Sequence, residues 1–457
     1  MKILLKIIFI ILSVTSFSCS MAPKYKSPEN NLPFTENKTQ NSKISWQNFF
    51  KNDELKTLIN KALKNNYNLE KARLNIESAR AIHGIARADL MPKISINSSV
   101  TRQGVSGVFA GFTPETIYRA NVGLTNYEVD FFGRIQSLKK AALEDYFATI
   151  NAKNLIEISL IAEVANAYIQ LALDLEILEI ANNNLEILTQ KEKLISLRHQ
   201  KGLASKIDTS NASADLENAK INFENYQNIT NQDKNALMTL VNDFDENNLP
   251  KILPLNEIKI AENNLEFLPS KNLLARFDIK QAEHKLKKAN ANIGAARAAF
   301  FPSISLTGTY GYQSIEATDL FNSKNWNFTP QINLPIFSGG RNFANLKNAN
   351  VLKQLEIINY QQVIQNAFVE VLDKISEKKS LNNQLQSRKK ILLAKEENKK
   401  FAKNKQKLGL INKLDLFSYE LDFLAAKQDN FLVNKNYFVN LIESYKALGG
   451  GSEIKEN

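Results

Sequence analysis

The residues that could do chemistry in this chain are few and far apart. Cys19 is the only cysteine among 457 residues, so no intramolecular disulfide and no cysteine-based metal cluster can form. The three histidines, His83, His199 and His284, lie far apart among charged residues, without metal-ligand spacing. No glycine pair is followed by the Gly-Lys-Ser or Gly-Lys-Thr of a nucleotide loop. The sequence therefore predicts no catalytic residue, no cofactor and no metal site.

Two acidic turns repeat within the chain. The segments Gly202-Leu-Ala-Ser-Lys-Ile-Asp208 and Gly409-Leu-Ile-Asn-Lys-Leu-Asp415 match at Gly, Leu, Lys and Asp, 207 positions apart. Glycine permits a tight turn between two helices. An aspartate just after such a turn can cap the next helix and stabilise its dipole. A functional role for Asp208 and Asp415 is compatible with that capping role.

A longer repeat joins a helix to a strand. Gly84-Ile-Ala-Arg-Ala-Asp-Leu-Met-Pro92 returns 210 positions later as Gly294-Ala-Ala-Arg-Ala-Ala-Phe-Phe-Pro302. In both copies an Ala-rich helical run ends at the proline, and strict apolar–polar alternation follows. A helix that runs into a strand twice in one chain suggests that the helix stands in water and the strand enters a membrane.

Four strands are expected, at 93–103, 116–129, 303–313 and 326–336. Each is about 10 residues long with alternating apolar and polar residues, which is the weak signature of a transmembrane barrel. A half-buried sheet in a soluble protein would give the same pattern. The membrane interpretation is favoured because two hairpins about 200 mostly helical residues apart share it.

Long helices are expected between the hairpins, at 134–200, 205–243, 341–407 and 412–448. The first meets neither proline nor glycine, and at about 1.5 Å per residue it would be nearly 100 Å long. It carries two apolar seams at heptad spacing, so it should pack neighbours on both sides, as in a wall of coiled coils. The fold class is mainly α with membrane β and an internal duplication.

The expected organisation follows from these elements. Residues 1–18 are a signal peptide, 19–45 an extended linker that is lipidated at Cys19, and 46–243 the first repeat. Residues 244–270 form a linker, 271–448 the second repeat and 449–457 a tail. The segment before Cys19 resembles a lipoprotein signal, although a plain signal peptide stays open. No later stretch has 18 uncharged apolar residues, so no helix is expected to cross a bilayer.

The distribution of charge argues against a nucleic-acid partner. The chain has 58 basic and 47 acidic residues, a formal net charge of +11. Lysines are spread along the whole chain, without a dense basic cluster interleaved with aromatic residues.

The strand count requires more than one chain. Four strands in hydrocarbon would leave two edges of unpaired backbone groups, each group costing several kcal/mol. Membrane sheets close, and the smallest barrels have about 8 strands. Several copies must therefore pool their hairpins, although the strand count does not decide how many.

Together these residues resemble the TolC-like outer-membrane efflux channels, in particular the lipoprotein branch that serves RND-type pumps. The likeness covers almost the whole chain. It includes residues 19–28 and 46–72, the two helix–strand repeats, 128–134, 335–341 and both acidic turns.

The resemblance implies a homotrimer with a 12-stranded barrel in the bacterial outer membrane and a helical barrel in the periplasm. A periplasmic adaptor and an inner-membrane pump would be its partners, with outer-membrane lipid around the barrel. The implied roles are gate residues Asp415, Asp208 and Ser418; adaptor-contact residues Gly202, Leu203, Gly409 and Leu410; and strand–helix junction residues Pro92, Pro302, Gly133, Arg134, Gly340 and Arg341. Three Asp415 side chains around one axis would set the electric field at the entrance, while Ser418 stands where a second acidic ring is expected.

The function implied is a passive exit duct for drugs, metals or other small molecules. One alternative is a TolC-type exit for type I protein secretion. An alternative of another class is a coiled-coil envelope scaffold without a pore, which the alternating hairpins disfavour.

Overall fold

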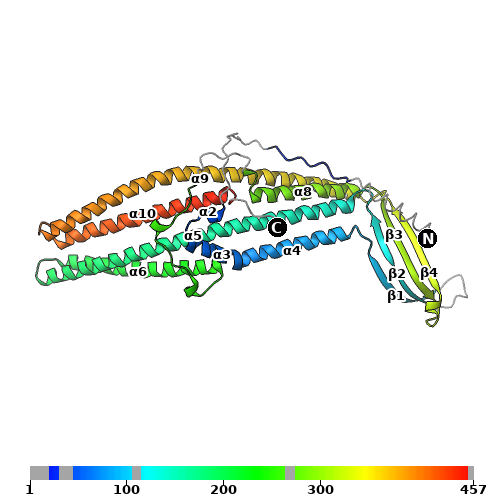
Figure 1. The fold of residues 1–457 in the computed structure, drawn as a ribbon, viewed down its shortest axis with the longest axis horizontal. Coiled ribbons are helices and arrows are strands. Elements are labelled where there is room, and N and C mark those ends of the chain that lie inside the picture. The colour runs from blue at the N-terminus through cyan, green and yellow to red at the C-terminus, as the bar shows by residue number, and fades with distance from the viewer. Residues whose placement is uncertain (1–19, 30–44, 105–114, 263–272, 451–457) are drawn as a thin grey trace. The chain divides into compact units, whose positions relative to one another are not determined.

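The computed structural model describes residues 20–29, 45–104, 115–262 and 273–450. These form two compact units (Figure 1). The first unit holds residues up to 31, 74–151 and 280–362, and the second holds 32–73, 152–279 and 363 onward. The expected signal peptide, Cys19 and most of the expected tail lie outside the described residues.

The fold is mainly helical with one four-stranded sheet, as the sequence predicts. The helices are α2 (Trp46–Phe49), α3 (Asp53–Asn65), α4 (Tyr67–Ala88), α5 (Arg134–Gln200), α6 (Lys206–Val241), α8 (Phe277–Ala298), α9 (Arg341–Lys407) and α10 (Lys413–Ala447). Helices α5 and α9 are both 67 residues long, as expected for a duplication. Two 3-10 turns, Glu246–Asn248 and Leu255–Glu257, lie in the segment expected as a linker.

The return helices are slightly shorter than expected because of their caps. Ser205 and Asn412 are N-caps in extended conformation, so α6 and α10 each begin one residue later than predicted. Asn242 adopts a left-handed conformation with φ of 54°, which ends α6 at Val241 rather than at 243.

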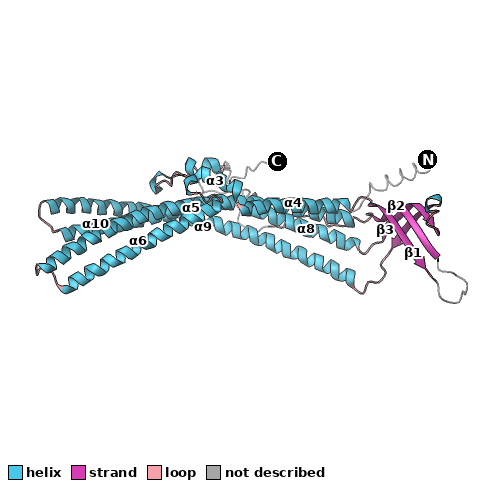
Figure 2. Cartoon of the chain, turned by 90° about the horizontal axis from the view of Figure 1, so that it is seen from below, coloured by secondary structure: helices cyan, strands magenta, loops and turns pink. Residues whose placement is uncertain are grey.

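The sheet is antiparallel in the order β1 (Ile94–Gln103), β2 (Glu115–Val129), β3 (Ser303–Ser314), β4 (Lys324–Asn333) (Figure 1). Figure 2 shows the strands in magenta and the helices in cyan. The register places Ile96, Val122, Tyr310 and Trp326 in one row across all four strands, and each of these side chains is exposed. A row of exposed apolar side chains fits a face turned to lipid. The expected end of β4 at 336 is wrong, since pairing stops at Asn333, ahead of Pro335, which has no N–H to donate.

The two edges of this sheet are β1 and β4, which are not paired with each other in the single chain. Pro330 lies inside β4, opposite Leu306 of β3. Proline is tolerated within sheets mainly on edge strands, because it removes one ladder hydrogen bond. Both edges therefore offer backbone groups to another strand.

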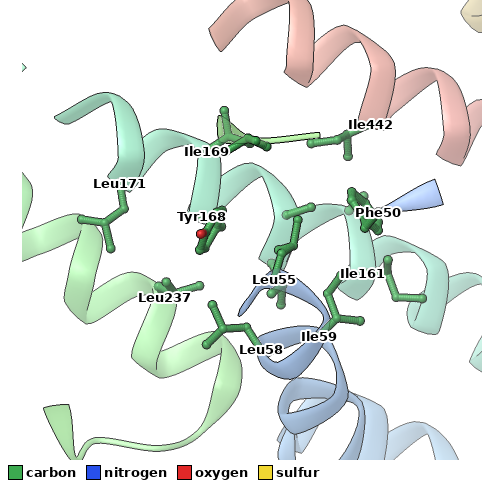
Figure 3. Close-up of a cluster of buried hydrophobic side chains, with 14 of the residues drawn as sticks. Phe50, Leu55, Leu58, Ile59, Ile161, Tyr168, Ile169, Leu171, Leu237 and Ile442 are labelled. Carbon is green, nitrogen blue, oxygen red and sulfur yellow. The ribbon is translucent and has the colours of Figure 1, made fainter. Parts of the chain in front are cut away.

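The core of the second unit gathers around α3 (Figure 3). Leu55, Leu58, Ile59 and Ala62 lie on one face of α3 and are fully buried. They pack in one cluster with residues of α5 and α6, including Tyr168 and Leu237. Burial of one such leucine or isoleucine contributes about 1.5–3 kcal/mol.

Helix α5 also holds a stretch long and apolar enough to span a membrane by composition alone. More than half of that stretch is buried within the protein. Leu160, Val164, Ile169 and Leu173 of α5 all belong to the core cluster, so packing against α3 and α6 accounts for the apolar composition.

A buried acid lies between α5 and α6. Asp174 is 3% exposed, and both of its carboxylate oxygens accept from Gln170 Nε2 at 3.1 Å. Burial, together with a hydrogen bond that the protonated carboxyl of Asp174 donates to Asp233, raises the pKa of Asp174 to about 7, while Lys435 opposes the shift. The folded state therefore binds a proton that the unfolded chain would release near pH 4.

Because the pKa of Asp174 is raised in the folded state, we expect the free energy of unfolding to fall as the pH rises. The pKa of Asp174 is higher in the folded than in the unfolded state. The stabilisation that this group contributes is therefore fully present below about pH 4 and is lost as the pH rises toward 7. Asp174→Asn should remove that dependence and stabilise the protein at pH 8 by about 1–3 kcal/mol. Thermal unfolding at pH 5 and pH 8 measures it, with exposed Asp53→Asn as the control. An unchanged pH dependence in Asp174→Asn would contradict the assignment.

Candidate functional site: the helical tip and the strand–helix junctions

The turn between α5 and α6 is built by a left-handed glycine and a capping box. Gly202 has φ of +72°, and the Leu203 N–H donates to the carbonyl of Arg198 at 2.8 Å, which closes the end of α5. Ser205 Oγ accepts from the Asp208 N–H at 3.1 Å. Asp208 Oδ2 in turn accepts from the Ser205 N–H at 2.8 Å. The two bonds satisfy the first donors of α6.

The turn between α9 and α10 has the same construction. Gly409 also has φ of +72°, and the Leu410 N–H donates to the carbonyl of Lys405 at 2.9 Å. Asn412 Oδ1 accepts from the Asp415 N–H at 3.0 Å, and Asp415 Oδ2 accepts from the Asn412 N–H at 3.2 Å. The two turns lie at the same end of the second unit's helices (Figure 1).

Both aspartates thus hold their helix ends, and both stay exposed. The hydroxyl and backbone N–H of Ser205 lower the pKa of Asp208, with Arg198 adding to the effect. Ser418 is exposed as well, and its hydroxyl donates weakly to the Leu414 carbonyl one turn earlier at 3.4 Å. A single chain therefore leaves these polar groups open toward whatever faces the tip.

The tip also exposes large apolar side chains. Leu203 is 67% exposed and Leu410 68%, and neighbouring Ile207 and Leu408 are exposed to a similar degree. Apolar side chains that gather on an exposed surface are typical of an interaction site.

The strand–helix junctions show how the prolines act. The Met91 N–H donates to the Ala88 carbonyl at 2.9 Å in the last turn after α4, then Pro92 leads into β1. At the second junction the Phe301 N–H donates to the Ala298 carbonyl at 3.0 Å before Pro302 and β3. Each proline ends helical bonding and starts extended chain.

The junctions that run from strand to helix each carry a glycine followed by an arginine, and they differ in whether that arginine is paired. Gly133 and Gly340 have φ of +70° and +79°. Arg134 makes a bidentate pair with Glu128, with Nε–Oε1 at 2.8 Å and Nη2–Oε2 at 2.6 Å. Arg134 therefore begins α5 as a paired arginine. Arg341 is exposed, and no ion pair is found for it within the described part of the chain.

A hollow of about 370 Å³ brings these junctions together. Its lining includes Pro302, Arg134 and Arg341, together with Glu128 and Phe131. Pro92, by contrast, is not part of this lining. The pairing of Glu128 with Arg134 was not predicted, although Glu128 lies only six residues before Arg134, near the end of an expected strand.

A second feature missed in the sequence is the packing of the N-terminal segment. Asn290 Nδ2 donates to the Pro23 carbonyl at 2.7 Å, and Tyr25 Oη donates to Glu283 at 3.3 Å. Burial raises the pKa of Tyr25 well above its usual range, with the charge of Glu283 adding to the shift. Residues 21–25 therefore lie along α8 as a strap rather than as a free linker.

Comparison with known proteins agrees with this architecture. The family model described as outer membrane efflux protein matches residues 58–243 and 268–450. A toluene efflux pump outer membrane protein, TtgC of Pseudomonas putida, is 35% identical, over 96% of this chain and 95% of its own length. The cation efflux system protein CusC of Escherichia coli is 34% identical, over 95% of this chain and 96% of its own length.

Solved structures give the same result. The open state of the Neisseria gonorrhoeae outer membrane channel MtrE has a TM-score of 0.84 at 34% identity, covering 95% of this chain and 98% of that one. A CusC crystal structure has a TM-score of 0.83 at 33% identity, covering 94% of this chain and 100% of that one. Membership of one family thus accounts for the two matched repeats, the four-stranded sheet and the long helices. This chain belongs to the outer membrane efflux protein family.

Proposed function

We propose that three copies of this chain form a passive exit duct across the outer membrane, with a 12-stranded barrel. The duct carries out no reaction of its own, and an inner-membrane pump supplies the energy. The relatives' names suggest the cargo class, since they include a toluene efflux pump protein and a cation efflux system protein. The cargo proposed here is accordingly small molecules or metal ions.

The observation that carries this proposal is the open sheet. Four strands present an exposed apolar row on one face and leave β1 and β4 as edges. In hydrocarbon an unpaired edge is prohibitively costly, so β4 of one copy must pair with β1 of another. Twelve strands from three copies close a barrel wide enough for an aqueous lumen, which four strands cannot do.

The N-terminal strap supports an anchor at Cys19. Arg297 Nη1 donates to the Met21 carbonyl at 3.4 Å, and Asn290, about two turns earlier in α8, donates to the Pro23 carbonyl. Arg297 is in the last turn of α8, which leads directly into β3. The described chain at Met21 thus lies beside the last turn of α8, directly ahead of β3, which supports a lipid anchor close to the membrane-entering strand.

The adaptor contact is proposed at the tip. Leu203 and Leu410 are exposed at the two turns, on backbone fixed by Gly202 and Gly409. A helical partner that covers these two leucines would bury apolar area without disturbing either capping box.

The entrance field is assigned to Asp415, with Asp208 and Ser418 beside it in the closed tip. Three like charges around a narrow axis repel one another and concentrate cations. Asp415 uses only one carboxylate oxygen, Oδ2, to cap α10, so the same side chain can cap the helix and set the field at the entrance.

Charge and cap can be separated by substitution. Asp415→Asn keeps an oxygen that accepts from Asn412 but removes the charge, whereas Asp415→Ala removes both. We expect both variants to lose block by divalent cations in single-channel recordings, and only Asp415→Ala to lose about 1 kcal/mol of helix-end stability. Asp53→Asn is the matched control, since Asp53 is an exposed first-turn acid of α3, away from both turns. Unchanged conductance and block in Asp415→Asn would remove the gating role.

The export function itself is tested in cells. A deletion strain should become sensitive to drugs, dyes or metals, and the wild-type gene should restore resistance. Crosslinking from Leu203 and Leu410 should capture a periplasmic adaptor. If deletion instead abolished secretion of one protein and left every sensitivity unchanged, the type I secretion role would replace small-molecule efflux.

A further inference from the structure

We propose that Arg119 of β2 selects for charge at the exit, and that one Arg119 from each copy forms a ring of cations on the wall of the lumen. The ring favours the passage of anions, so it adds a preference for anionic cargo to the proposed duct. The inference rests on the proposed function, because the polar face of the sheet lines water only if the sheet closes into a barrel.

Arg119 lies on the polar face of the sheet. It pairs with Ser99 of β1 on one side and with Gln313 of β3 on the other. Residues alternate between the two faces, so the exposed apolar Val122 and Tyr310 belong to the opposite face. An arginine turned to lipid would cost about 2–4 kcal/mol at the middle of the bilayer, whereas residues that face the lumen set selectivity.

The side chain of Arg119 is held in place by two neighbouring strands. Arg119 Nε donates to Gln313 Oε1 at 3.1 Å, and Asn325 Nδ2 of β4 donates to the same oxygen at 2.9 Å. Both partners are neutral amides, and no ion pair of Arg119 is found among the described residues. The bond through Nε therefore orients the guanidinium without neutralising its charge.

The other rows of the polar face are uncharged between the ends of the strands. Their side chains are mostly hydroxyls and amides, such as Asn97, Asn121, Thr309 and Asn327. Groups of this kind offer hydrogen bonds to passing solutes of either charge. The charge of the wall is thus decided by the few ionised residues on it.

The acidic residues on this side of the chain lie toward the ends of the strands. Glu128, near the periplasmic end of β2, is paired with Arg134. At the outer end Glu115 begins β2, and the exposed Glu316 and Asp319 lie in the loop that follows β3. Between these ends, the described side chains place one charge on the polar face, and it is positive.

The second repeat does not contribute another cation to the ring. In each hairpin, the residue seven positions after the junction proline pairs with Arg119 in the first repeat and with Asn327 in the second. The matching position of β4 is therefore a neutral amide. Each chain supplies one charge, so three copies supply three.

A ring of three arginines reaches the whole width of the lumen at low salt. Twelve strands about 4.8 Å apart and tilted by about 40° enclose a radius of about 12 Å, so inward side chains hold their charges within about 10 Å of the axis. The screening length is about 30 Å at 0.01 M salt and about 3 Å at 1 M. The ring should therefore act on ions in dilute salt and lose its effect in concentrated salt.

The exit ring opposes the proposed ring at the entrance. Three Asp415 side chains concentrate cations at the tip, whereas three Arg119 side chains repel them at the barrel. The contribution of the exit is therefore measured with the entrance charge removed, in the Asp415→Asn background as well as in the wild type.

Reversal potentials of the full-length protein in planar bilayers, across a gradient of KCl, test the proposal. In the Asp415→Asn background, Arg119→Gln should lower the ratio of anion to cation permeability roughly threefold in dilute KCl and leave it unchanged near 1 M. Arg119→Lys should keep the ratio, because it keeps the charge. Arg102→Gln is the matched control, since Arg102 is an exposed cation on the apolar face of the neighbouring strand β1.

Two further variants separate charge from structure. Gln313→Leu removes the partner of Arg119 but keeps the charge, so it should keep the ratio. If Arg119→Gln fails to assemble, Arg119→Cys can be labelled in the assembled channel with a cationic or an anionic thiol reagent. The cationic label should raise the anion preference and the anionic label should reverse it, while the labelled wild type reports any reaction at Cys19.

The outcomes distinguish this proposal from the duct itself. A conducting Arg119→Gln channel with an unchanged ratio in dilute KCl would overturn the charge selection and leave the duct intact. An equal shift in Arg102→Gln or in Gln313→Leu would do the same. A wild-type particle that carried no current would remove the duct and the exit ring together.

Discussion

Gly311→Ala is expected to prevent the protein from assembling in the outer membrane. A Cβ on Gly311 in β3 would stand 2.2 Å from the Ala120 carbonyl oxygen and 2.5 Å from the Asn121 Cα of β2. Both contacts are with backbone, so no side-chain rotation can relieve them. The strands would have to separate where β2 and β3 join the two repeats.

Such overpacking costs about 1–3 kcal/mol in each chain, and an assembly of three would carry it three times. Heat-resistant oligomer on gels and the outer-membrane fraction measure the loss. Gly308→Ala is the matched control three positions earlier in β3, because its Cβ would find its nearest atom at 3.6 Å, an ordinary contact. Equal assembly of both variants would contradict the close approach of the strands.

Arg276→Met is expected to destabilise the second unit by about 3–5 kcal/mol. Arg276 is 8% exposed and holds three partners at once. Nη2 lies 2.8 Å from carboxylate oxygens of both Asp278 and Glu370, and Nη1 donates to the Ala447 carbonyl at 2.5 Å. It thus ties the start of α8 to α9 and to the last residue of α10. Methionine fills similar volume but leaves two carboxylates without their cation.

Arg388→Met provides the comparison. Arg388 pairs with Asp429 at 2.6 Å, yet both side chains are more than a third exposed, so this pair should contribute about 0–1 kcal/mol. The melting temperature of the purified protein, followed by helical circular dichroism, measures both. A similar small decrease for the two variants would show that the Arg276 network does not hold these helices together.

The sequence predicted the bounds of the long helices well where the apolar periodicity and the helix-breaking glycines agree. The helix from 134 to 200 was bounded correctly because Gly133 precedes it and the next helix breaker is Gly202. Strand ends were less certain, since apolar alternation continues past Asn333 to Leu334 and Ile336 although pairing does not. Hydrogen bonding, unlike alternation, stops ahead of Pro335.

The candidate site could be predicted only in part, because several of its contacts form only once the backbone is folded. The sequence located both acidic turns, but the capping bonds of Asp208 and Asp415 depend on the extended backbone of Ser205 and Asn412. The pairing of Arg134 with Glu128 depends on where β2 ends, and the strap on α8 depends on contacts hundreds of residues apart. Contacts of this kind leave no periodic signal in a sequence.

A single chain has too few strands to close a barrel, so we infer that several copies assemble around a water-filled lumen. The most direct measurement is the mass of the detergent-solubilised particle together with its conductance in a planar bilayer. We expect a mass of three chains and steady ohmic current through single openings. A particle of one chain that carries no ions would contradict the account.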